Sequence, residues 1–288
     1  MRRICAVVAV VAAASTAMAG CGKASPPARA LSATTSHLSD IHSGRLTMSM
    51  LGSSATGSDT SGGAEGFRLE GPFSVATKKG TLPVADLQFT RVVGGSEQKT
   101  RFISTGSAAF LRIDSGVYRL PESRVADLRA RGPAGKDAGL AGLDLDKWVS
   151  HPTMRAAGSI GGVPVVRITG QLDPIRAIND MLSVASGLGA SDPGSPTHLT
   201  GSAADRVRRA VRSSEIEIVS GRDDHLLREL RVTIGLAVSE KDRLRSALGR
   251  LAGVRLSMQL AVAGPNTPVH VTAPENARPA SELPNSGS

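Results

Sequence analysis

Cysteine and aromatic side chains are scarce in this sequence. Of its 288 residues only Cys5 and Cys21 are cysteine, and the aromatic complement is five Phe, Tyr118 and Trp148. A core must therefore be built from Leu, Val, Ile and Ala. The formal charge of +9 would suit nucleic acid. Too few aromatic rings are present for base stacking, so no nucleic-acid partner is expected.

The first apolar run is too short to span a membrane. Residues 4–14 (ICAVVAVVAAA) are eleven apolar residues, whereas a helix that crosses a bilayer needs about 20. Arg2 and Arg3 precede the run, and small residues lead from Ala17 to Cys21. This order is typical of a secretory signal peptide. Because it ends in a cysteine it resembles the bacterial lipoprotein type, in which residues 1–20 are cleaved and Cys21 is acylated.

The alternative is an ordinary secreted protein that is cut near Ala19, with Cys21 incidental. In either case Cys21 is the only cysteine of the mature chain, so no intramolecular disulfide can form. Loss of Arg2 and Arg3 from the 34 Lys+Arg leaves 32 basic against 25 acidic side chains, a formal +7.

The lipoprotein interpretation predicts an exported protein, anchored by acylated (palmitate-bearing) Cys21 to the outer face of the cell membrane. A positive balance suits an anionic lipid surface.

The rest of the chain is predicted to contain many short strands and few helices. Period-two alternation is clearest in residues 229–236 and 254–262, and it indicates antiparallel strands with one apolar face. Further strands are predicted over 45–51, 67–76, 84–93, 99–105, 108–113, 116–120, 215–218 and 269–273, and residues 155–173 are predicted to form a strand pair that turns at Gly161-Gly162. Helices are predicted over 31–43, 174–186 and 202–212, with Asp173 as the N-cap of the second.

These elements predict an α+β fold: a single curved antiparallel sheet, a half-barrel covered on its concave face by helices. A sheet with one apolar face must cover that face, and the helices at 31–43 and 174–186 are available. The predicted organisation is a signal peptide (1–20), a lipid anchor and tether (21–30), one domain (31–275) and a flexible tail (276–288).

An additional amphipathic helix is predicted over 239–251 (SEKDRLRSALGRL), where two strands could have been joined by a short hairpin. Its Leu face and neighbouring arginines suit either a membrane-facing role or packing on the domain.

Catalytic signatures are missing from the sequence. It contains no HExxH, no GxSxG and no Walker loop. The SEQK of residues 96–99 matches SxxK, but it lies in a predicted hairpin turn without the companion motifs. The six histidines show no ligand spacing. We therefore expect no enzyme activity, no metal and no cofactor.

Several segments carry a resemblance to a known family. The lipoprotein signal, GGVPVVRITGQLD (161–173), EIEIVSGRDDHLLRELRVTI (215–234) and VHVTAPENARP (269–279) resemble the mycobacterial LppX/LprA/LprF/LprG lipoproteins. More distantly, the pattern is similar to LolA-like periplasmic carriers. The resemblance covers residues 21–280. It implies a LolA-like half-barrel that holds lipid or glycolipid chains in an apolar cavity and carries them across the cell envelope.

A carrier of acyl chains needs apolar lining and no chemistry. Candidate lining residues come from the alternating strands: Phe89, Phe102, Leu111, Val232, Ile234, Leu256 and Met258. Composition alone does not separate a lined cavity from a filled core. The alternative function is therefore a cell-surface sensor or adaptor that binds a protein partner.

Overall fold

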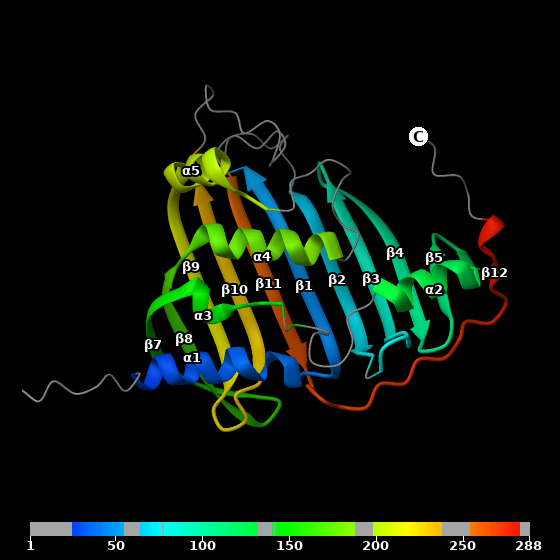
Figure 1. The fold of residues 1–288 in the computed structure, drawn as a ribbon, viewed down its shortest axis with the longest axis horizontal. Helices are drawn as coiled ribbons and strands as arrows, with labels where there is room; N and C mark the ends of the chain where they lie inside the picture. Colours follow the sequence, from blue (N-terminus) through cyan, green and yellow to red (C-terminus); the bar gives the residue numbers. More distant parts are fainter. Residues whose placement is uncertain are drawn as a thin grey trace, which may run out of the picture.

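The computed structural model describes residues 25–54, 64–76, 78–131, 140, 142–187, 198–237 and 254–282. Its centre is one large curved sheet of twelve strands, in the order β12-β6-β5-β4-β3-β2-β1-β11-β10-β9-β8-β7 (Figure 1). All neighbouring strands pair antiparallel except β12 and β6, which are parallel. The sheet is not closed, because β7 and β12 are its two edges. The predicted single, mostly antiparallel sheet is confirmed.

The strands are β1 (Ser43–Ser54), β2 (Glu65–Ser74), β3 (Val84–Val93), β4 (Ser96–Thr105), β5 (Ala109–Ile113), β6 (Gly116–Arg119), β7 (Val149–Ile160), β8 (Val163–Leu172), β9 (Val211–Gly221), β10 (Leu227–Leu236), β11 (Val254–Ala263) and β12 (Arg278–Pro279). The helices are α1 (Pro26–Ser36), α2 (Glu122–Arg131), α3 (Leu145–Trp148), α4 (Pro174–Gly187) and α5 (Gly201–Ala210). Short 3-10 turns follow at His37–Asp40 (η1) and Ala280–Glu282 (η4).

The strand register aligns apolar side chains in rows on one face of the sheet. One row crosses ten strands through directly opposed residues: Met154, Ile168, Ile218, Leu230, Leu260, Met48, Leu69, Phe89, Thr100 and Ile113. Since successive side chains of a strand alternate between faces, residues one position away lie on the other face. That other face carries ion pairs, including those of Arg68 with Glu97 and of Arg231 with Glu217. We call the two the apolar face and the polar face.

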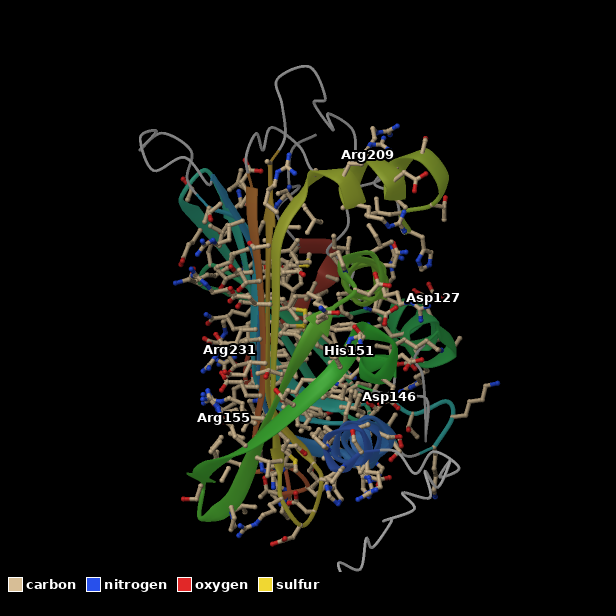
Figure 2. All side chains as sticks on the ribbon, turned by 90° about the vertical axis from the view of Figure 1, so that its left-hand side faces the viewer. Asp127, Asp146, His151, Arg155, Arg209 and Arg231 are labelled. Carbon is tan, nitrogen blue, oxygen red and sulfur yellow. The ribbon has the colours of Figure 1, made fainter. Side chains whose placement is uncertain are left out.

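The helices lie on one side of the sheet, the side of the apolar face (Figures 1 and 2). Leu31 of α1, Trp148 of α3, Ile178 of α4 and Val207 of α5 all belong to the same buried cluster as strand residues of the apolar face. The sheet alone would leave this face in water, and burial of apolar area provides the driving force for docking the helices.

The first helix begins earlier than the sequence predicted. It starts at Pro26 rather than Leu31, and residues 26–30, assigned to the tether, form its first turn. Proline occupies the first helical positions, where its missing N–H is not needed and its φ suits the helix. The Pro26-Pro27 pair, interpreted as linker, is therefore a helix start. Asp173 does cap α4 as predicted, since its Oδ1 accepts hydrogen bonds from the N–H groups of Ile175 and Arg176.

The last predicted strand is wrong. Residues 269–273 form no strand, because both neighbours of β11 in the sheet, β1 and β10, are already in place and no edge is open beside it. The chain instead pairs at the far edge through β12, inside the segment predicted as a flexible tail. There the Arg278 guanidinium lies 4.7 Å from the ring centroid of Tyr118 and donates to its hydroxyl at 2.8 Å.

The predicted signal peptide (1–20) and the acylated Cys21 lie outside the described residues, and so does the helix predicted over 239–251. The flanks of the latter, Leu236 and Val254, are paired with each other at the ends of β10 and β11. In the part of the chain that the structure describes, no helix has the length and hydropathy to cross a membrane.

Candidate ligand-binding face

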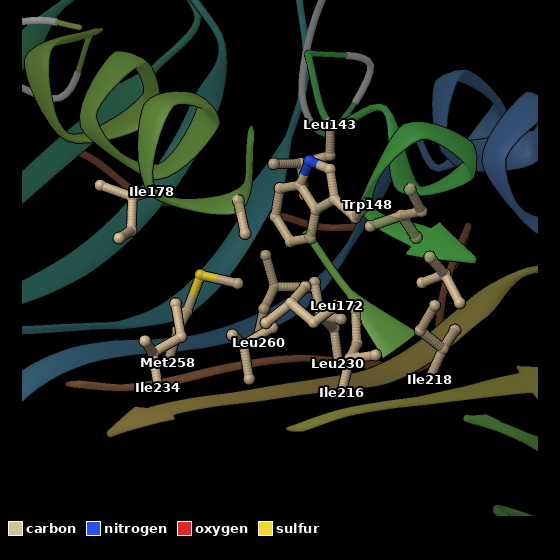
Figure 3. Packing of buried hydrophobic residues seen from close by; sticks show 14 of the residues in the cluster. Leu143, Trp148, Leu172, Ile178, Ile216, Ile218, Leu230, Ile234, Met258 and Leu260 are labelled. Carbon is tan, nitrogen blue, oxygen red and sulfur yellow. The ribbon is translucent and has the colours of Figure 1, made fainter. Parts of the chain in front are cut away.

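The apolar face divides into two regions that differ in how completely they are covered. We call β8–β11 with α1, α3, α4 and α5 the filled region. Its cluster is dense, and its fully buried members include Ile168, Ile218, Leu230 and Ile234. The exposed fraction of Ile234 is 0%, so no space large enough for water adjoins that side chain. Figure 3 shows Trp148 and Ile178 above the strand residues Leu230 and Leu260.

Trp148 joins two helices within the filled region. Its side chain is 1% exposed, and its Nε1–H donates to Asp180 Oδ2 of α4 at 2.7 Å. A buried indole N–H without an acceptor would be costly, so this bond fixes α4 against α3. Trp148 is the last residue of α3 and belongs to the main core.

The second region, β1–β5, is covered less completely, and we call it the open region. At its outer end Ala109 of β5 is buried together with Leu82 and Val125. Next to the filled region, Met48, Phe67 and Leu69 form another buried cluster, and the rings of Phe67 and Phe89 stack with centroids 5.8 Å apart. Around this cluster the side chains of the apolar face keep part of their surface. They are Leu46, Met50, Leu87, Phe89, Phe102 and Leu111.

A pocket lies at the outer end of the open region, between β5, α2 and η4. Its volume is about 420 Å³, within the usual range of small-molecule sites. It is lined by Leu111, Leu120, Pro121, Arg124, Asp127, Leu128 and Ala280. Leu128 is 41% exposed. The pocket continues the apolar face, because Leu111 opposes Phe102, which in turn opposes Leu87.

The register places all seven predicted lining residues on the apolar face. Val232 opposes Met258 and Ile234 opposes Leu256, while Phe102 and Leu111 oppose each other on β4 and β5. Phe89 lies in the ten-strand row. Val232, Ile234 and Met258 are buried in the filled region, whereas Leu256, Phe89, Phe102 and Leu111 keep accessible surface. Contact with a ligand stays a prediction for all seven, and the four with accessible surface are the better placed.

Sequence reasoning missed Leu46, Met50 and Leu87 as members of this face. The signal was available, since Leu46, Met48 and Met50 alternate with polar residues in RLTMSML. The Asp180 contact of Trp148 had no signal, because the two residues are 32 positions apart.

The polar face carries ion pairs between side chains of different strands. Glu217 pairs with Arg167 and Arg231, at N···O distances of 3.2 and 3.0 Å. Hydrogen bonds from Arg68, and then from Lys99, lower the pKa of Glu97. The Asp86 carboxylate, by hydrogen bonding, raises the pKa of Arg101.

No group of three or more potential metal-ligating side chains occurs among the residues described. The one histidine pair within ring contact there is that of His37 and His225, with ring centroids 5.8 Å apart.

The class of fold is therefore an open, curved, one-sided antiparallel sheet that packs its helices against a single apolar face. No protein-family model matches the chain, and no curated protein matches it. Among solved structures it is similar to LprF from Mycobacterium bovis, with 13% identity and a TM-score of 0.39 over 88% of this chain and 99% of that one. It is also similar to a LolA superfamily protein from Nitrosomonas europaea, with 9% identity and a TM-score of 0.20 over 85% and 96% of the two chains.

LprF is one of the four lipoproteins that the sequence resembles. At these TM-scores the likeness carries no argument about function, which is therefore argued from the residues of this chain.

Proposed function

We propose that the protein binds lipid or glycolipid acyl chains on the open region of its apolar face and carries them in the cell envelope. In this proposal the helices cover a concave face, and the acyl chains lie on the part of that face that the helices leave open. Acylated Cys21 holds the protein at the outer face of the cell membrane. The protein supplies binding and no reaction, so we propose no enzyme activity.

One observation carries the proposal: the row of apolar side chains runs further across the sheet than the filled core does. Leu87, Phe89, Phe102 and Leu111 continue the apolar face beyond that core and keep accessible surface. Each methylene group that moves from water onto such a surface contributes about 0.8 kcal/mol. An acyl chain of ordinary length therefore binds by area alone, without a specific polar contact.

The direct test is mass spectrometry of organic extracts from purified Cys21→Ala protein. This variant carries no covalent acyl chains that could be mistaken for bound lipid. Stoichiometric lipid is expected. Its absence, together with binding of a protein partner through the exposed Leu128 surface, would favour the adaptor function instead.

A pair of tryptophan variants tests the face. Leu256→Trp is expected to lower the amount of bound lipid, because Leu256 is partly buried on the apolar face and opposes Gly52 of β1, so that a larger ring there reaches the border of the open region and occupies ligand space. Ser257→Trp is the matched control, since its side chain lies on the polar face. Equal lipid in both variants, or a loss of stability with lipid unchanged, would contradict the proposal. The Ile234→Trp change is less informative, because overpacking a filled site costs about 1–3 kcal/mol.

The anchor is tested separately. Cys21→Ala should give an exported protein that no longer sediments with membranes after a high-salt wash, since two acyl chains are needed for stable anchoring. If the Cys21→Ala protein still sediments with membranes, the proposed anchoring through Cys21 is wrong.

A further inference from the structure

The start of the described chain lies at one end of the sheet, together with the β7–β8 and β9–β10 turns. Helix α1 contacts β7 and β8, and His37, just after α1, reaches His225 in the β9–β10 turn. In Figures 1 and 2, α1 and the β7–β8 hairpin lie at this end and α5 lies at the opposite end. We call it the α1 end.

The β7–β8 hairpin exposes apolar side chains at the α1 end. The described chain has four exposed large apolar residues. Two of them, Met154 (39% exposed) and Ile160 (41% exposed), belong to β7. Ile160 directly precedes the turn at Gly161-Gly162, where a Cβ added to either glycine would meet no atom within 4 Å. The tip of the hairpin, which we define as residues 154–163, therefore projects into open space.

The same hairpin carries positive charge without acidic side chains. Residues 149–172 contain Arg155 and Arg167 but no Asp or Glu. The two arginines oppose each other on neighbouring strands, an arrangement that is unfavourable for like charges. Arg167 approaches Glu217 at 3.2 Å. Arg155 has no ion-pair partner among the described residues, and Figure 2, which looks toward the β7 edge, shows it on the polar side. An anion from outside the chain would offset the repulsion between Arg155 and Arg167.

The short tether limits how the molecule can stand on a membrane. Only three residues, 22–24, separate Cys21 from Ser25, so the two Cα atoms are at most about 14 Å apart when the chain is fully extended. A ten-residue strand such as β10 is about 33 Å long. The acyl chains of Cys21 therefore hold the α1 end near the bilayer, while the opposite end can lie well beyond the reach of the tether.

We propose that the β7–β8 hairpin tip docks on an anionic bilayer surface beside the acylated Cys21, with Ile160 in the headgroup layer and Arg155 on lipid phosphates. This orientation rests on the proposed anchoring. It directs α5 and the flanks of residues 238–253 away from the membrane, contrary to a membrane-facing role for the helix predicted over 239–251.

The test uses single-cysteine labels in the full acylated protein, where the thiol of Cys21 is blocked. Ser159→Cys places a fluorophore at the proposed docking tip. Ser96→Cys is the matched control, because Ser96 is also an exposed serine beside a Gly-Gly hairpin turn, at the opposite end of the sheet. The probe is a vesicle of phosphatidylcholine and phosphatidylglycerol with a headgroup-attached quencher. Quenching several-fold stronger at position 159 than at 96 is expected.

Two variants separate this orientation from simple tethering. Arg155→Gln should weaken the quenching at position 159 about fivefold, the effect of one lost basic residue at an anionic surface. Ile160→Ser should also weaken it, whereas Val93→Ser, an exposed apolar residue at the opposite end, should not. Flotation of the acylated protein with the vesicles reports the anchor independently. If the protein floats but both labels are quenched equally, or position 96 more, the orientation is wrong and the anchor stands. If it does not float, both are wrong.

Discussion

The filled and open regions share one sheet and one apolar face, yet they differ in how completely helices cover their apolar side chains. In the filled region four helices supply side chains, and Leu230 and Ile234 have no accessible surface left. In the open region, apart from α2 at its outer end, described side chains of the helices contribute little, and Leu87, Phe89 and Phe102 stay partly exposed. Stability is therefore concentrated on one side of the molecule, and apolar surface that a ligand could cover is concentrated on the other.

The largest expected difference between the regions comes from a matched pair of leucines. Leu230→Ala should lower the free energy of unfolding by about 2–5 kcal/mol, because it leaves a cavity in a filled core. Leu87→Ala should cost only about 1 kcal/mol, since its side chain is already partly exposed. Urea unfolding of both variants measures the difference. Equal losses would mean that the two regions are packed alike.

A smaller effect is expected at the bond that joins α3 and α4. Asp180→Ala should cost about 1–3 kcal/mol, because it leaves the buried Trp148 Nε1–H without its acceptor. Asp180→Asn retains an acceptor oxygen and should lose less. Fluorescence of Trp148, the sole tryptophan, follows unfolding directly. If Asn and Ala cost the same, the hydrogen bond is not what fixes α4.

The smallest effect is expected on the polar face of the open region. Bonds from Arg68 and Lys99 lower the pKa of Glu97 below its ordinary value of 4.5. A carboxylate with a lowered folded pKa stabilises the fold above its unfolded pKa, and the contribution is lost as pH falls through the folded pKa. Wild type should therefore melt slightly above Glu97→Gln at pH 7 and together with it in strong acid. Because the pair is exposed, a large difference at pH 7 would contradict this description.

Much of the fold could be predicted because period-two alternation and turn glycines are local signals. Strand β3 matches its predicted bounds, and Asp173-Pro174 marks the start of α4. The pairing of Arg278 with Tyr118 could not be predicted, since it joins residues 160 positions apart. Residues 269–273 alternate like a strand, but strand formation also requires an open edge, which depends on the whole topology.

The candidate site was predicted as a face but not as two regions. Alternation assigns Val232 and Phe89 equally to the apolar side, because it reports direction and not coverage. Whether a side chain belongs to the filled or to the open region depends on which helices lie above it. The position of those helices is decided by long-range packing. The distinction between Ile234 and Leu256, which oppose each other, is visible only in three dimensions.

Quenching by a lipid with brominated acyl chains tests the central claim most directly. Wild-type protein reports the filled region through Trp148 alone, and Phe89→Trp adds a reporter in the open region. We predict that saturating brominated lipid quenches the emission added at position 89 and leaves that of Trp148 unchanged. Quenching of Trp148 in the wild-type protein, with none at position 89, would show that acyl chains bind elsewhere and would contradict the account.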